Sequence, residues 1–488
     1  MILLVLFTLV VAYAVNFLYK KWRVYRLLLD NFKTPPRHPI FGTLTIFPKT
    51  APEIFKTFLS LFGKYGKNFV LTRPILDAQI IISDAKDVEA ILTNPNTKNA
   101  RKAAGYRILE PWLGTGLLTS YGEKWFTRRK IITPSFHFNI LDDFVNVMSK
   151  QSDILMKHLK SMAGKGEVDI YPIVNAFALD VISETAMGVT VNAQADPNSE
   201  YVTSVKKMSR AVQERLHHPL GKTGLYNLTS KGKYQKTLTT ILHNFTDKII
   251  GERRDQLLSN TKIDKGSHMN FLDILLHASV GGKPLTNADI REEVDTFMFE
   301  GHDTTASGMA FTLYLLSRHA DVQEKLYQEL KKVFGSKDEM EITNKKLIGL
   351  EYLEMVIKES LRILPPVPGI GRQLMEDTLI GGTTVPAGVN LLLSIYAMQH
   401  DPDYYPNPEK FDPERFRSQS DNKRTFAYIP FSAGGRNCIG QKFALLDLKT
   451  LIAKVIMNFK LLPGPEVILQ GDLILKASNG IRIRFEQR

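Results

Sequence analysis

The chain has a single cysteine among its 488 residues, Cys438. One cysteine excludes an internal disulfide framework, and this scarcity fits a reducing compartment. Any chemistry that needs sulfur from cysteine must therefore use one thiol. That thiol lies in the segment FSAGGRNCIG at 431–440, among glycines and beside an arginine.

Motifs for nucleotides and nucleic acids are also missing. There is no G-x-G-x-x-G stretch, and the glycines at 220–225 do not complete a phosphate-binding loop because position 216 is Leu. No basic block interleaved with aromatic residues stands out. The net charge of +13 therefore favours anionic lipid or an acidic protein partner over nucleic acid.

The first 19 residues contain no charged side chain. As a helix they would span about 28 Å, close to the hydrocarbon core of a bilayer. The basic residues that follow would hold that flank in the cytosol: Lys20, Lys21, Arg23 and Arg26. Ala12-Tyr13-Ala14 resembles a signal-peptide cleavage site, but the basic region that should precede it is absent. We predict a membrane anchor at 1–19, a basic and proline-rich linker at 20–42 and a catalytic domain at 43–488.

Helical hydrophobic patterns dominate the rest of the chain. They cover 141–162, 286–318, 321–334 and 350–364, whereas strand-like runs are short, at 69–72, 78–83, 383–386 and 389–394. Polar stretches at 190–207 and 258–270 are typical of surface loops. The pattern predicts a mainly α fold with small β-sheets.

The segment 286–318 carries an unexpected polar cluster. Thr286 and Asp289 can cap its start. Glu300, Gly301 and Asp303 then interrupt an apolar helix, where buried carboxylates cost several kcal/mol unless they have partners. The alternative is a solvated helix face, but the apolar residues around the cluster favour a functional site.

Cys438 has several possible roles. A lone buried cysteine is usually a small hydrophobic residue. A nucleophile would need a histidine that the sequence cannot place, and zinc would need more ligands nearby. The third possibility is one thiolate bound to a cofactor that supplies the other ligands, such as haem. Gly434, Gly435 and Gly440 allow close approach of backbone and ring, and Arg436 could bind a propionate.

These residues carry a resemblance. Phe431, Gly434, Arg436, Cys438 and Gly440 match every fixed position of the haem-binding motif of the cytochrome P450 superfamily. The resemblance implies the cytochrome P450 fold, with haem b bound between the long central helix and the cysteine loop, and Cys438 as the iron ligand.

Other motifs match the same superfamily in order along the chain. Glu359 and Arg362 resemble its Glu-x-x-Arg pair, and Arg415 resembles the third member of that structural network. Trp125 and Arg129 match a Trp-x-x-x-Arg motif that binds haem propionates. Arg372 resembles another propionate ligand.

The helix 286–318 matches the oxygen-binding groove of the superfamily. The resemblance implies that Gly301 leaves room for dioxygen and that the catalytic pair Asp303 and Thr304 delivers protons. Segments such as PWLGTGLL and EVDTFMFEGHDTT resemble the family 4 branch, which contains fatty-acid ω-hydroxylases. In that branch a glutamate at the position of Glu300 often forms an ester with a haem methyl group.

The resemblance implies a membrane-anchored monooxygenase of the endoplasmic reticulum that faces the cytosol. It would hydroxylate a lipophilic substrate with dioxygen, most simply a fatty acid at its ω-carbon. Electrons would come from NADPH through a separate cytochrome reductase, with cytochrome b5 as a further donor. Basic residues near the cysteine loop are candidates to meet such a partner: Lys423, Arg424, Lys442 and Lys449.

Three other functions remain open from the sequence. One is a monooxygenase of xenobiotics or hormone precursors. The second is a haem-thiolate isomerase or dehydratase, although such enzymes often lack the acid–alcohol pair seen here. The third is a haem-binding sensor without catalysis.

Overall fold

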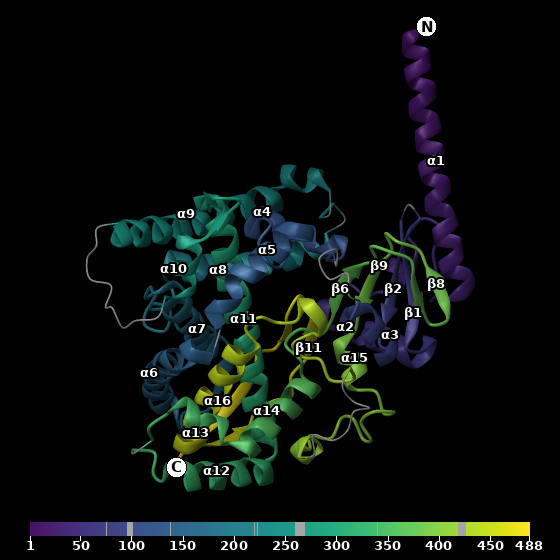
Figure 1. The fold of residues 1–488 in the computed structure, drawn as a ribbon. Helices are drawn as coiled ribbons and strands as arrows, with labels where there is room; N and C mark the ends of the chain where they lie inside the picture. The colour runs from purple at the N-terminus through teal and green to yellow at the C-terminus, as the bar shows by residue number, and fades with distance from the viewer. Residues whose placement is uncertain are drawn as a thin grey trace.

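The computed structural model describes residues 1–74, 76–94, 101–136, 138–218, 220–221, 223–258, 269–338, 340–417 and 426–488. Most of them are helical, and a helical layer adjoins a smaller region of strands (Figure 1). In chain order the α-helices are α1 (Ile2–Asn31), α2 (Ala51–Tyr65), α3 (Ala85–Leu92), α4 (Glu110–Leu113), α5 (Gly122–Ile132), α6 (Phe138–Met162), α7 (Ile170–Ile182), α8 (Glu200–His217), α9 (Ser230–Leu258), α10 (Phe271–His277), α11 (Asn287–Arg318), α12 (Ala320–Phe334), α13 (Asn344–Ile348), α14 (Glu351–Ile363), α15 (Ile395–Gln399) and α16 (Gln441–Asn458).

The strands form several small sheets. The largest has the order β1-β2-β9-β6, in which β2 and β9 are parallel and the other neighbours antiparallel. A second sheet has the order β10-β13-β3, and the remaining strands pair as hairpins. The bounds are β1 (Asn68–Arg73), β2 (Asp77–Ile82), β3 (Glu167–Asp169), β4 (Ser279–Val280), β5 (Lys283–Pro284), β6 (Ile370–Gln373), β7 (Thr378–Ile380), β8 (Thr383–Val385), β9 (Asn390–Leu393), β10 (Phe459–Pro463), β11 (Leu469–Gly471), β12 (Leu475–Ala477) and β13 (Arg482–Gln487).

The helix α11 forms the centre of the helical region (Figure 1). It packs against α7, α9, α14 and α16, and almost every side chain along its second half is buried. Thr286 caps its start, and the reciprocal bond from the Thr286 N–H to the Asp289 carboxylate is also present, as the sequence predicts. A buried helix of this length holds its polar residues at fixed positions inside the molecule.

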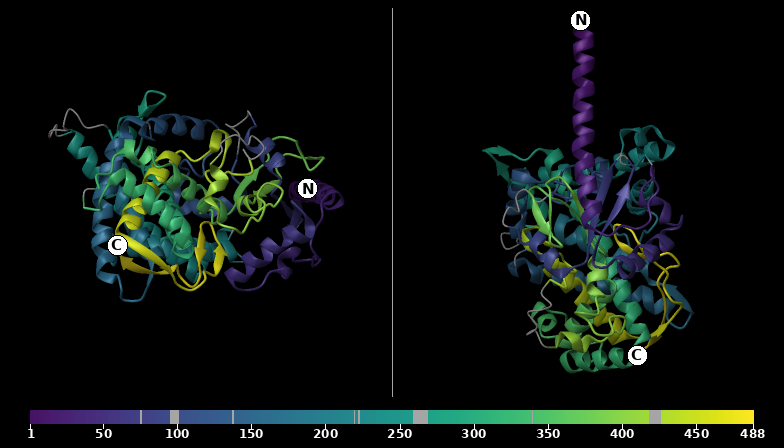
Figure 2. Two further views of the ribbon diagram at one scale, coloured as in Figure 1. Left: turned by 90° about the horizontal axis from the view of Figure 1, so that it is seen from below. Right: turned by 90° about the vertical axis from the view of Figure 1, so that its right-hand side faces the viewer.

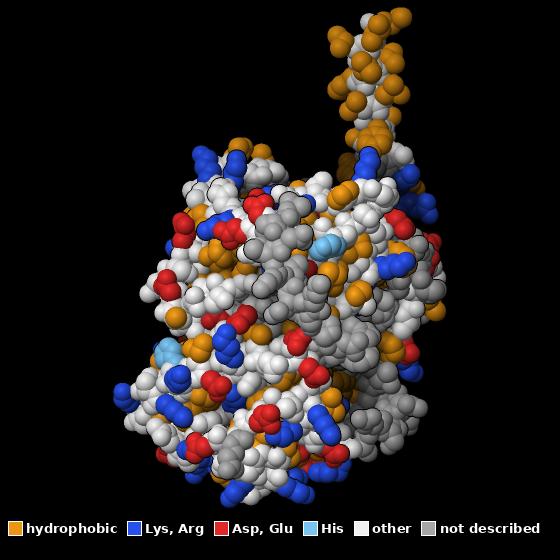
Figure 3. Space-filling model, turned by 60° about the vertical axis from the view of Figure 1, so that its left-hand side comes forward, with side chains coloured by type: hydrophobic (Ala, Val, Ile, Leu, Met, Phe, Trp, Pro, Cys, Tyr) orange, Lys and Arg blue, Asp and Glu red, His pale blue; other side chains and the backbone are white. Residues whose placement is uncertain are grey.

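The N-terminal helix α1 projects from the body (Figures 1 and 2). Its apolar span has a mean hydropathy of 2.4 and is not buried, so α1 is long and apolar enough to cross a membrane. Hydrophobic side chains cover the projecting part, and blue basic side chains lie at its base (Figure 3). The helix does not end near residue 19, since it continues to Asn31, where Leu28 is buried beside the body.

Most predicted elements lie within a few residues of their observed bounds. The four helical patterns correspond to α6, α11, α12 and α14, and the strand-like runs correspond to β1, β2, β8 and β9. The loop predicted at 190–207 is wrong in its second half, because Ser199 caps α8 and the helix begins at Glu200. Most of the loop predicted at 258–270 lies outside the described residues.

Candidate active site

A cavity of about 250 Å³ lies between α11 and the loop that carries Cys438. The Cys438 thiol faces this cavity, so its accessible surface is internal. Burial raises the pKa of the thiol to about 11, and the nearby Glu300 acts in the same direction. The backbone N–H of Gly440 bonds to the sulfur and has the opposite effect. A bound metal ion would favour the thiolate instead.

The cysteine loop is held by backbone contacts. The Cys438 N–H donates to the carbonyl oxygen of Phe431 at 2.9 Å. Gly434 has a φ of +70°, and a Cβ at this position would lie 1.8 Å from the Leu92 carbonyl oxygen at the end of α3. Only glycine fits there. The helix α16 begins at Gln441, so Cys438 lies just before its N-terminus.

Two predicted propionate ligands lie at the cavity beside the cysteine loop. Arg436 donates from Nη2 to the Ser120 carbonyl oxygen at 2.6 Å, and its guanidinium lies 4.6 Å from the centre of the Trp125 ring. Arg129 donates to both the carbonyl and the side-chain oxygen of Asn437 at 2.8 Å. Arg436, Arg129 and Trp125 all line the cavity.

Arg372 and Lys102 add further positive charge. Arg372, on β6, is buried and donates to the Gly371 carbonyl oxygen at 3.1 Å, but its side chain is not among those that line the cavity. Lys102 lines the cavity, and burial together with the charges of Arg372 and Arg436 lowers its pKa well below the ordinary value. Tyr106, four residues further along the chain, also lines the cavity. The sequence did not single out Lys102 or Tyr106, because a lysine and a tyrosine at this spacing match no motif.

This donor set fits haem. Burial and the charge of Arg372 lower the pKa of Arg436 to about 9, so a negatively charged group beside it would be favourable. A planar cofactor with two carboxylates would supply that charge, and its iron would meet the thiol. Among the described residues there is no group of three or more His, Cys, Asp or Glu side chains that could hold a metal ion.

The opposite wall of the cavity is the middle of α11. Glu300, Gly301, Thr304 and Thr305 line it, and the Thr304 hydroxyl donates to the Glu300 carbonyl oxygen at 2.6 Å. Burial raises the pKa of the Glu300 carboxyl, although Lys102 and Arg436 oppose the shift. A Cβ at Gly301 would lie 2.8 Å from the Ile182 side chain, so this glycine also lets α7 pack closely on α11.

Asp303 does not share the cavity with Thr304. Its carboxylate accepts a hydrogen bond from the Tyr171 hydroxyl at 2.5 Å and pairs with Lys476 Nζ at 3.0 Å. Burial alone would raise the pKa of Asp303, but the charge of Lys476 and these hydrogen bonds bring it below the ordinary value. The helix turn between residues 303 and 304 points the two side chains in different directions.

The predicted structural network is formed as a buried cluster. Arg362 Nε lies 2.7 Å from Glu359 Oε2, and both side chains are fully buried. Arg415 Nε lies 3.3 Å from the other oxygen of Glu359. Arg362 also donates to the carbonyl oxygens of Gln399 and Pro408, and the Gln399 side chain accepts from the Ile429 N–H. These bonds connect α14 to the segment that leads into the cysteine loop.

The basic residues suggested as partner contacts differ in exposure. Lys442 is exposed at the start of α16. Lys449 is buried and bonds to Glu354 and to the Leu347 carbonyl oxygen, so it cannot meet a partner. Lys423 and Arg424 lie outside the described residues.

A single cavity-facing cysteine and a surrounding set of cations fit the site of a haem-thiolate protein. Residues 33–484 match the family model described as Cytochrome P450. The chain therefore belongs to the cytochrome P450 family, and it is a monooxygenase.

Curated relatives refine the placement to family 4. Cytochrome P450 4d2 of Drosophila melanogaster is 41% identical over 92% of this chain and 92% of its own length. Human cytochrome P450 4V2 is 40% identical over 92% of this chain and 88% of its own. Cytochrome P450 4c3 of Drosophila melanogaster is 37% identical over 94% of this chain and 90% of its own.

Proposed function

We propose that the enzyme hydroxylates a fatty acid or a similar lipid at its ω-carbon. The observation that carries the proposal is the composition of the cavity walls. Apart from the charged groups beside the cysteine loop, aliphatic and aromatic side chains line much of the cavity, among them Leu109, Leu117, Phe136, Phe297, Phe299 and Leu473. Such walls favour an extended apolar chain over a polar substrate.

The residues of the chain would position the cofactor and move protons. Haem, when bound, supplies the activation of dioxygen, with one oxygen atom entering the substrate and the other leaving as water. Cys438 would ligate the iron, while Trp125, Arg129, Arg372 and Arg436 would hold the propionates. Thr304 lines the cavity, and its hydroxyl, which donates to the Glu300 carbonyl oxygen, could accept and pass a proton there. Because its lowered pKa keeps Asp303 ionised, it would relay a proton toward Thr304 rather than store one, and its partner Lys476 reaches the surface with a side chain 26% exposed.

The electrons would come from NADPH through a separate cytochrome reductase, with cytochrome b5 as a second donor. The chain has no nucleotide-binding motif, which supports an external source. We place the enzyme in the endoplasmic reticulum membrane with α1 as a single-pass anchor and the body in the cytosol. The basic residues after the apolar run support this orientation.

Glu300 is proposed to form an ester with a methyl group of haem b. The carboxylate lines the cavity and is poorly solvated, and an ester would remove that buried charge. Forming the ester removes one proton and two electrons from the methyl group. Dioxygen, the oxidant of the turnover reaction, accepts these electrons. After turnover and acid denaturation, haem should stay with the wild-type polypeptide and separate from Glu300→Ala. Complete separation from the wild type after many turnovers would refute the ester.

The substrate is tested with the full-length protein, reductase and a panel of fatty acids of different chain length. We expect terminal alcohols as the main products and NADPH consumption that depends on the fatty acid. Products hydroxylated only inside the chain would refute ω-selectivity. Turnover of xenobiotics or hormone precursors without any fatty-acid product would support the other monooxygenase function.

A further inference from the structure

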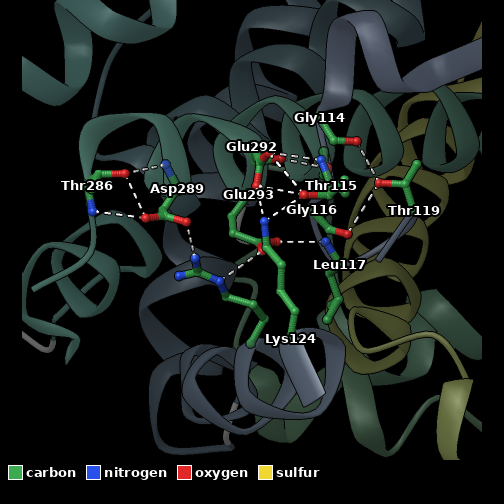
Figure 4. A network of polar contacts seen from close by, with 12 residues as sticks. Gly114, Thr115, Gly116, Leu117, Thr119, Lys124, Thr286, Asp289, Glu292 and Glu293 are labelled. Atoms are coloured by element: carbon green, nitrogen blue, oxygen red, sulfur yellow. Dashed lines mark hydrogen bonds and ion pairs between the residues drawn. The ribbon is translucent and has the colours of Figure 1, made fainter. Parts of the chain in front are cut away.

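Two neighbouring glutamates near the start of α11 bind the loop at 114–120 (Figure 4). Glu292 accepts hydrogen bonds from the Thr115 N–H at 3.0 Å and from Lys124 Nζ at 2.6 Å. Glu293 accepts from the Leu117 N–H at 2.9 Å. The two carboxylates therefore hold backbone groups two residues apart on the same loop.

Two glycines bring the loop this close to the helix. Gly114 has a φ of +54°, and a Cβ there would lie 2.4 Å from the Glu292 side chain. A Cβ at Gly116 would lie 2.5 Å from the Glu292 carbonyl oxygen and 2.6 Å from the Thr296 hydroxyl. Because side chains are excluded at both positions, the loop backbone lies directly on α11.

The same loop binds Arg436 through its carbonyl groups. Arg436 Nη2 donates to the carbonyl oxygens of Ser120 at 2.6 Å and Leu117 at 3.3 Å. Leu117 thus bonds to Glu293 through its N–H and to Arg436 through its carbonyl oxygen. The side chains of Leu117 and Leu118 line the cavity.

Glu293 is energetically unfavourable at this position. Its side chain is fully buried, and the nearest cation, Arg128, lies 3.8 Å away at Nε while its Nη2 pairs with Asp289. Burial raises the pKa of Glu293 to about 7, against the opposing bond from Leu117 and the charge of Arg128. A buried carboxyl with so few close partners lowers the stability of the folded protein. Its one hydrogen bond shorter than 3 Å is the one that fixes Leu117.

We infer that Glu293 is a positioning residue for Arg436: through the backbone of Leu117 it sets where the guanidinium lies at the cavity. Neither Glu293 nor Glu292 lines the cavity. The inference rests on the proposed role of Arg436 toward the haem propionates, and it does not depend on the identity of the substrate. A failure of ω-hydroxylation would therefore leave it standing.

The test compares haem loss to excess apomyoglobin from full-length variants that carry haem and have not yet turned over, so that the proposed ester with Glu300 has not formed. Glu293→Ala removes the acceptor for the Leu117 N–H, and haem loss should be about tenfold faster than in the wild type. Glu293→Gln keeps an acceptor oxygen, so it should restore haem loss to within about twofold of the wild type. A wild-type rate in Glu293→Ala would overturn the inference.

A double-mutant comparison separates positioning from general stability. In an Arg436→Lys background, Glu293→Ala should add little further haem loss, because the two changes act through one route. A further tenfold increase in the rate of haem loss in that background would show that Glu293 does not act through Arg436. If Glu293→Ala does not load haem, Glu293→Asp, which shortens the side chain by one methylene, should give an intermediate rate and the same non-additivity.

Glu329 offers a matched control. It accepts hydrogen bonds from the backbone N–H groups of Tyr352 and Leu353 at 2.7 and 2.9 Å, between α12 and α14. Glu329→Ala should lower the melting temperature without changing haem loss in the folded protein. If Glu329→Ala speeds haem loss as much as Glu293→Ala, the effect is a general consequence of lost carboxylates and the inference fails.

Discussion

Buried charged groups behind the cysteine loop and on α11 differ in how well they are compensated. Behind the cysteine loop, Glu359 and Arg362 are fully buried and bonded to each other, and Arg362 also reaches backbone carbonyl oxygens. On α11, burial raises the pKa of Glu293 to about 7 and that of Asp295 to about 8, and it also raises the pKa of Glu300. The charges of Glu359 and Arg362 compensate each other, whereas ionising these three carboxyls on α11 is unfavourable; Asp303, which pairs with Lys476, is the exception on that helix. Costly buried carboxyls are typical of functional sites.

Breaking the ion pair of Glu359 and Arg362 should have the largest effect on stability and haem content. Glu359→Ala leaves Arg362 as a buried charge without its carboxylate, which costs about 3–5 kcal/mol. We expect little haem-bound protein, measured from the haem absorbance per polypeptide and from thermal unfolding.

An exposed pair in the same region is the control. Glu414 and Arg417 are bonded at 2.5 Å, but the two side chains are 41% and 59% exposed. Arg417→Ala should cost less than about 1 kcal/mol and leave haem content unchanged. Equal effects of the two substitutions would remove the distinction between buried and exposed charge.

The next largest effect is expected from a substitution of Asp303 on α11. Asp303→Asn keeps the size of the side chain but removes the acid and its ion pair with Lys476. If it relays protons, kcat should fall by about a hundredfold with little change in KM. A fall in substrate affinity with unchanged kcat would assign Asp303 a structural role.

Thr304→Ala removes the hydroxyl of a residue that lines the cavity. Haem content and substrate binding should stay as in the wild type, because the Thr304 bond to the Glu300 carbonyl oxygen lies within the helix. The ratio of hydrogen peroxide to hydroxylated product should rise by about tenfold or more. The measurement is peroxide and product per NADPH consumed, and an unchanged ratio would exclude the proposed role.

Asp295 gives an effect on stability, not on catalysis, and this effect depends on pH. Because its pKa is raised to about 8 by burial, against the bond from Thr246, the folded protein holds a proton that the unfolded chain releases near pH 4. Its contribution to stability is therefore lost as the pH rises toward 8. Relative to Asp295→Asn, the wild type should lose up to about 1.4 kcal/mol per pH unit between pH 6 and 8. If the free energies of unfolding of the wild type and Asp295→Asn change in parallel between pH 6 and 8, Asp295 is already charged in the folded protein.

The sequence predicted the parts of the site that depend on short-range spacing. Glu359 and Arg362 are three residues apart on one helix face, so their pairing follows from the helix period. The bond between Thr286 and Asp289 at the start of α11 likewise depends on neighbours in sequence. The cysteine loop was predicted from one contiguous motif.

Contacts between distant segments could not be predicted in this way. Nothing in the sequence indicates that Glu293 binds the Leu117 N–H, because the two residues are far apart in the chain. Asp303 was predicted beside Thr304, yet Lys476 and Tyr171 from other elements hold its side chain elsewhere. Lys449 was predicted at the surface, but tertiary packing buries it against Glu354.

The central claim, that Cys438 is the thiolate ligand of haem, has one direct measurement. The reduced full-length protein is treated with carbon monoxide, and its absorbance spectrum is compared with that of Cys438→Ala. The wild type should show the red-shifted Soret band of thiolate-ligated haem, and Cys438→Ala should lose this band together with most of the bound haem. A Cys438→Ala protein that keeps the red-shifted band would contradict the assignment of the ligand.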